Sequence, residues 1–81
     1  MIPEVIAAQY VEDFTIHIRF ADGTEGDVDL GSELHGEMFE PLKDPAVFRK
    51  FVVHPDFHTL SWPNGADFAP EFLYEKVQVP A

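Results

Sequence analysis

The sequence predicts an α+β fold: an antiparallel sheet of about four to five strands built from hairpins, one short helix packed on the sheet, and a short C-terminal helical turn. Residues 14–20 alternate strictly between apolar and polar side chains, which is typical of a half-buried strand. Turn-forming residues at 21–23 and 63–65 each separate two β-leaning runs, as in β-hairpins. Residues 44–51 begin with the signals of a helix N-terminus.

The first hairpin has a predictable register. Residues 5–11 form a β-leaning run, and residues 25–30 are expected to return beside residues 14–20. A three-residue loop with Gly23 in the left-handed conformation places apolar residues together on one face and complementary charges on the other. The expected pairs are Phe20 with Thr24, Arg19 with Glu25, Ile18 with Gly26, His17 with Asp27, Ile16 with Val28 and Phe14 with Leu30.

The middle of the chain is expected to hold a loop followed by the short helix. Residues 31–42 show no clean period and predict a loop with one irregular turn, anchored by Met38, Phe39 and Leu42. Residues 44–51 predict the helix, because Asp44 suits the N-cap and Pro45 the first helical position. Two turns are too few to be stable alone, so this helix must pack on the sheet.

A second hairpin is expected to follow. Residues 52–54 and 58–62 are predicted strands, and residues 63–65 are predicted to form a three-residue loop with Gly65 in the left-handed conformation. This register pairs Trp62 with Ala66 and Leu60 with Phe68, which places four apolar side chains on one face. Pro70 then opens a helical turn over residues 71–76.

The segment from Trp62 to Tyr74, W-P-N-G-A-D-F-A-P-E-F-L-Y, is the most specific motif of the chain. It is preceded by F-x-D-G at residues 20–23 and by F-x-x-L-x-D-x-x-x-F at residues 39–48. With these motifs the chain resembles the bacterial family known as domain of unknown function 2442, from roughly Val5 to Val77.

That resemblance implies a small α+β domain that often stands alone and is sometimes fused to a helix-turn-helix domain. Some members are encoded beside another small uncharacterised protein, in an arrangement like that of toxin–antitoxin pairs. The resemblance implies no known activity.

Length and composition exclude several classes of protein. The 81 residues predict a single domain, residues 1–81, with a modest core. The chain has fifteen Asp and Glu residues and five Lys and Arg residues, for a formal net charge of −10. This excess of negative charge argues against direct binding to nucleic acid. The chain has no cysteine, and the sequence shows neither a membrane-spanning run nor a signal peptide, so a cytoplasmic location is expected.

Residues suited to catalysis or metal binding are present without the required context. His54 and His58 are four residues apart with Asp56 between them, but Pro55 argues against the helix that would bring two imidazoles together. No serine lies in a nucleophile motif, and no glycines form a phosphate-binding loop. We therefore expect no catalytic residue, no cofactor and no metal, and we expect that the protein is not an enzyme.

Two groups of residues remain candidates for an interaction surface. The first is the part of the tail motif that turn and core roles do not fully explain, and the second is the polar face of the predicted return strand. These candidates are Trp62, Asn64, Asp67, Glu71 and Tyr74 in the tail, and Glu25, Asp27 and Asp29 on the strand.

The sequence thus favours a non-enzymatic, acidic interaction domain. The acidic charge favours a basic partner, and the family resemblance implies that this partner is a small protein in an antitoxin-like arrangement; a second copy of the chain is the other expected partner. Either the acidic strand face or an exposed sheet edge would make the contact. The alternative hypothesis is a small-ligand or metal-binding sensor domain of the kind attached to helix-turn-helix regulators.

Overall fold

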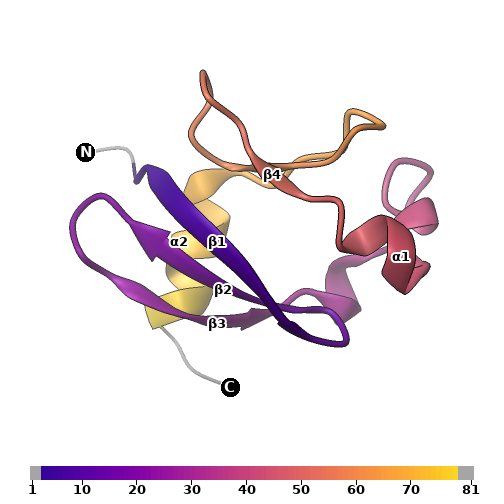
Figure 1. Ribbon diagram of the computed structural model, residues 1–81, viewed down its shortest axis with the longest axis horizontal. Helices are drawn as coiled ribbons and strands as arrows, with labels where there is room; N and C mark the ends of the chain where they lie inside the picture. The colour runs from indigo at the N-terminus through magenta and orange to yellow at the C-terminus, as the bar shows by residue number, and fades with distance from the viewer. Residues whose placement is uncertain (1–2, 79–81) are drawn as a thin grey trace.

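The computed structural model describes residues 3–78 and has an α+β fold with two antiparallel sheets (Figure 1). The larger sheet contains β1 (Val5–Glu12), β2 (Thr15–Phe20) and β3 (Glu25–Asp29) in the order β1-β2-β3. The smaller sheet pairs β4 (Val52–Val53) with β5 (Leu60–Ser61). The predicted fold class is confirmed, and its strands are divided between two sheets.

The β2–β3 hairpin has the predicted register. In the strands, Arg19 pairs with Glu25, Ile18 with Gly26, His17 with Asp27 and Ile16 with Val28. At the two ends of the hairpin, the Phe20 N–H donates to the Thr24 carbonyl and the Leu30 N–H donates to the Phe14 carbonyl. Gly23 has a φ of +92°, as the three-residue loop requires. Because side chains alternate between the faces of a strand, this register puts the apolar residues of β2 in the core.

β1 pairs with β2 through two irregularities, between Val5 and Ala7 and between Tyr10 and Glu12. Each inserts one extra residue, and these residues, Ile6 and Val11, are 52% and 43% exposed. Val5 remains buried, and its N–H donates to the His58 carbonyl, which joins β1 to the loop of the smaller sheet.

The segment between the sheets is more ordered than the sequence predicts. It contains two 3₁₀ helices, η1 (Gly31–Glu33) and η2 (Glu40–Lys43), where we expected one irregular turn. Leu42 is fully buried as expected, but Met38 is 46% exposed and does not anchor the loop. Leu34, which the sequence analysis overlooked, is buried instead.

The predicted short helix is present as α1 (Pro45–Phe48). Its N-cap is Asp44, whose carboxylate accepts a hydrogen bond from the Ala46 N–H at 3.0 Å, as predicted. The helix ends earlier than the expected residue 51, and its packing fits the expectation that tertiary contacts hold it, because Phe48 is fully buried.

The second hairpin also has the predicted loop. Gly65 has a φ of +92°, the Trp62 N–H donates to the Ala66 carbonyl, and the Phe68 N–H donates to the Leu60 carbonyl. The strands are shorter than expected, because the chain from His54 to Thr59 forms a loop that the His54 ring stabilises by accepting two backbone N–H bonds. α2 (Pro70–Gln78) begins at Pro70 and is longer than the helical turn predicted for residues 71–76.

The core lies between the two sheets, the connecting segment and α2. Figure 1 shows α2 against one face of the larger sheet, where the Tyr74 ring meets the edge of Phe20 with the centroids 4.9 Å apart. Gly26 of β3 permits this close approach, because a Cβ there would lie 3.2 Å from Val77 Cγ1. The largest buried side chains come from all parts of the chain: Val5, Ile16, Ile18, Phe20, Leu30, Leu34, Leu42, Phe48, Leu60 and Leu73.

Candidate interaction surface

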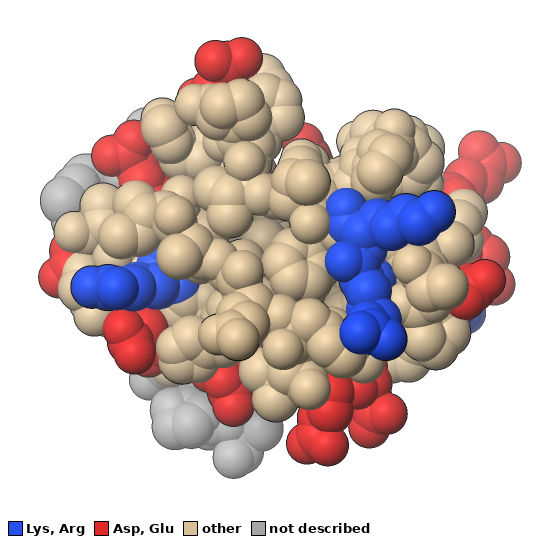
Figure 2. Space-filling view, in the orientation of Figure 1, with Lys and Arg blue, Asp and Glu red and all other residues tan. Residues whose placement is uncertain are grey.

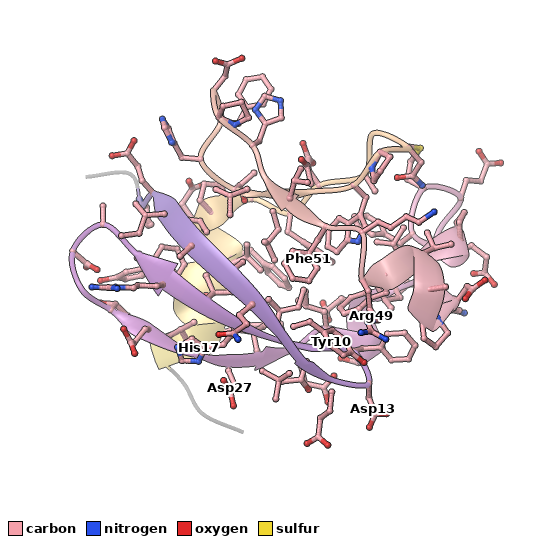
Figure 3. All side chains as sticks on the ribbon, viewed as in Figure 1. Tyr10, Asp13, His17, Asp27, Arg49 and Phe51 are labelled. Carbon is pink, nitrogen blue, oxygen red and sulfur yellow. The ribbon has the colours of Figure 1, made fainter. Side chains whose placement is uncertain are left out.

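The acidic side chains of β3 lie together on the outer face of the larger sheet, as the sequence predicted. Glu25, Asp27 and Asp29 alternate along the strand and are exposed. Basic residues of β2 lie opposite them: His17 Nδ1 lies 2.7 Å from Asp27 Oδ1, and Arg19 Nε lies 3.6 Å from Glu25 Oε2 (Figure 3 labels the histidine–aspartate pair). The sheet therefore neutralises part of its own acidic face.

The electrostatics of this face follow from those contacts. The hydrogen bond with Asp27 is the main cause that raises the pKa of His17 above its ordinary value of 6.5, and Glu25, 3.5 Å from His17 Nε2, adds to the effect. The third carboxylate, Asp29, accepts a hydrogen bond from the Gly31 N–H at 2.9 Å and so supports the start of η1. All three predicted carboxylates thus have local partners.

A shallow cavity of about 390 Å³ lies over the same face of the sheet. Small side chains on β1 form part of its floor, and polar side chains on β2 and β3 border it. Its lining residues are Ala7, Ala8, Gln9, His17, Arg19 and Glu25. With one arginine, one histidine and one carboxylate, this cavity has mixed charge and does not define one class of ligand.

Trp62 is not part of the surface, which corrects the sequence-based assignment. Its side chain is 3% exposed, and its indole Nε1 donates a hydrogen bond of 2.8 Å to the Phe48 carbonyl at the end of α1. Its ring also packs against Phe48 and Phe68, with centroids 5.8 Å apart in both pairs. Trp62 therefore joins the second hairpin to α1.

Asn64 and Tyr74 are also engaged in contacts within the molecule. The Asn64 side chain accepts a hydrogen bond from the Ala66 N–H and donates one to the Met38 carbonyl, both at 3.0 Å. The Tyr74 hydroxyl donates to Asp22 Oδ2 at 2.5 Å, and this bond is the main cause that lowers the pKa of Asp22. These contacts tie distant segments together, so they account for both residues structurally.

Asp67 and Glu71, the other two tail candidates, are exposed. Asp67 borders a second cavity of about 330 Å³ between the connecting segment and the start of α2, which we call the aromatic cavity. Glu71 lies in the first turn of α2, beside this cavity, but does not line it. The lining residues are Glu33, His35, Phe39, Asp67, Phe68, Ala69 and Phe72.

Sequence reasoning identified only Asp67 among those residues. The others come from two segments about 30 residues apart in the sequence, and the first was predicted to be a loop with one irregular turn, without a role in binding. One available signal was the group Phe68, Phe72 and Lys76 at intervals of four residues, which places one ring after another along the entry to α2.

The histidines do not form a metal site with the surrounding carboxylates. His54 accepts hydrogen bonds from the N–H groups of Asp56 and Phe57, whereas His58 Nε2 lies 3.5 Å from Glu4 Oε2. Across residues 3–78 no three His, Asp or Glu side chains are close enough to hold a metal ion together. Over the same residues, no helix has the length and apolar character needed to cross a membrane.

The fold defines the class as a small α+β domain made of two hairpin-based sheets and a C-terminal helix. The chain belongs to the family described as "Protein of unknown function (DUF2442)", whose model matches residues 5–78. No curated protein and no solved structure matches the chain significantly.

Proposed function

We propose that the protein is a non-enzymatic interaction domain that acts in the cytoplasm and binds a small basic protein, as an antitoxin binds its toxin. The observation that carries the proposal is the uncompensated negative charge of the chain, a formal −10 over 81 residues. Opposite fields accelerate encounter between two proteins and disfavour partners of like charge.

The few cations leave this charge largely available to a partner. Arg19 and Lys43 already lie within 3.6 Å of a glutamate carboxylate, while Arg49 and Lys76 lie over the rings of Tyr10 and Phe72. Figure 2 shows Asp and Glu side chains around the rim of the molecule, with most of the central face uncharged. A basic partner would therefore meet carboxylates along several edges of the domain.

Coexpression tests the proposal directly. The tagged full chain is expressed together with any small protein encoded beside its own gene, and the purified complex is examined by mass spectrometry and by light scattering. We expect a hetero-complex with a basic partner whose dissociation constant rises steeply with salt, because screening weakens attraction between exposed charges. Light scattering at the same time distinguishes this complex from a homo-oligomer.

Two results would remove the proposal. One is that no basic protein associates stoichiometrically with the domain in low salt. The other is a complex whose affinity is the same at low and high salt, since such binding would not depend on the charge excess. A matched variant, Glu37→Gln with Asp56→Asn, lowers the negative charge by two at exposed side chains and should weaken a charge-driven complex.

A further inference from the structure

The aromatic cavity combines a size, a wall and a charge that fit one kind of occupant. We propose that it binds an arginine side chain presented by a protein partner. This inference deepens the proposed function, on which the basic nature of the partner rests, by naming the site and the side chain that enters it. It also assigns a role to Asp67, which the fold does not require.

The size of the cavity suits one long side chain. Its volume is about 330 Å³, which lies at the lower end of the roughly 300–1,000 Å³ of ordinary ligand pockets. The cavity is a shallow, open depression, so it offers one side of a wall to a side chain that projects from the surface of a partner.

The wall is a row of three phenylalanine rings. The centroids of Phe39 and Phe68 are 4.8 Å apart, and those of Phe68 and Phe72 are 5.6 Å apart with nearly parallel planes. Such a wall packs well against the aliphatic stem of a long basic side chain. Lys76 Nζ, one turn further along α2, lies 5.3 Å from the centroid of Phe72, so the last ring of the row already has a cation beside it.

The charge of the cavity comes from Glu33 and Asp67. Neither carboxylate takes part in any of the hydrogen bonds or ion pairs found among residues 3–78, unlike Glu25, Asp27 and Asp29 on the sheet. These carboxylates exclude an anion, although α2 begins beside the cavity. They favour a guanidinium over an ammonium, because its planar set of donors can bond carboxylates in pairs and stack on rings.

The position of Asp67 follows from the second hairpin. Asp67 bridges to Ser61, while its neighbours Ala66 and Phe68 are buried. Alternation along an extended chain then directs the Asp67 side chain away from the core, and it reaches the border of the aromatic cavity.

A titration followed by ¹H–¹⁵N NMR tests the inference without a known partner. The probe is the capped tripeptide Gly-Arg-Gly at millimolar concentration, and the control is the same peptide with citrulline, which keeps the shape and lacks the charge. We expect saturable shifts of the backbone N–H signals of residues 33–39 and 67–72 with the arginine peptide alone. Asp67→Asn and Glu33→Gln should each raise the dissociation constant of the arginine peptide about fivefold, because an exposed ion pair contributes at most about 1 kcal/mol.

Asp56→Asn is the matched control, because it removes one exposed carboxylate that does not line the cavity. The inference is overturned if the shifts scatter over the surface, if citrulline produces the same shifts, or if Asp67→Asn and Asp56→Asn weaken binding equally. Failure of the proposed function would look different. In that case arginine would enter the cavity, but coexpression would yield no basic partner.

Discussion

The indole of Trp62 offers the sharpest test of how this small core is held together. We predict that Trp62→Phe lowers the free energy of unfolding by about 2–4 kcal/mol. The Phe48 carbonyl, at the end of α1, would lose the 2.8 Å bond from Nε1 and remain without that donor in a buried site, which costs about 1–3 kcal/mol. The smaller ring buries roughly 40 Å² less apolar surface, which costs about 1 kcal/mol more.

The assay is urea unfolding followed by circular dichroism, with a thermal melt as a second measurement. For a domain of 81 residues, each 1 kcal/mol corresponds to about 4–8 °C, so Tm should fall by at least about 8 °C. A second variant separates the two contributions. Benzothienylalanine at position 62 keeps the bicyclic shape but has no N–H group, so it should lose about 1–3 kcal/mol and no more.

Hydrogen exchange would locate the effect. The bond joins α1 to the second hairpin, so the N–H groups of Phe48 and Arg49 should exchange faster in both variants than in the wild type. If the benzothienylalanine variant unfolds at the same urea concentration as the wild type, the indole hydrogen bond does not stabilise the fold. The assignment of Trp62 as a link between α1 and the hairpin would then be wrong.

Three further predictions concern single residues. Gly65→Val should cost about 1–3 kcal/mol in urea unfolding, because the residue has a φ of +92° that valine resists, and an unchanged midpoint would refute the turn assignment. His17 should titrate by NMR above pH 6.5, and Asp27→Asn should lower its pKa. The stability that comes from this raised pKa is complete below pH 6.5 and is lost as the pH rises through the higher pKa of the folded state. Comparing the wild type with His17→Gln across the pH range would show this loss. Asn64→Asp should lower the free energy of unfolding by about 0.5–1 kcal/mol, because aspartate keeps the acceptor for the Ala66 N–H and loses the donor to the Met38 carbonyl. A thermal melt measures this change, and a variant as stable as the wild type would show that the bond to Met38 contributes nothing.

The two hairpins could be predicted because their information is local. Placing Gly23 and Gly65 in the left-handed conformation fixes the loop length, and side-chain alternation then fixes every pair in the strands. The division into two sheets could not be predicted in this way. It depends on β1 meeting the β4–β5 loop through a backbone bond from Val5 to His58, which joins residues 53 positions apart in the sequence.

The structure of the connecting segment also could not be predicted from local sequence. Its buried residue Leu34 and its exposed residue Met38 are both apolar, and no period in the sequence distinguishes them. The Met38 carbonyl accepts a hydrogen bond from Asn64 in the loop of the second hairpin, so the path of this segment depends on a contact between residues 26 positions apart. For the same reason the aromatic cavity was not predicted, because three of its seven lining residues, Glu33, His35 and Phe39, belong to this segment.

The tail motif can now be divided by what its polar atoms bind. The Trp62 indole, the Asn64 amide and the Tyr74 hydroxyl each join the tail to a segment far away in the sequence, so selection for folding alone would keep them. Asp67 and Glu71 form no such bond among residues 3–78, and both are exposed near the start of α2. Glu71 lies in the first turn of α2, where a carboxylate stabilises the helix through its dipole, whereas Asp67 lies before the helix and has no such role. An interaction through this end of α2, rather than through the self-neutralised face of β3, would give Asp67 a reason to be acidic.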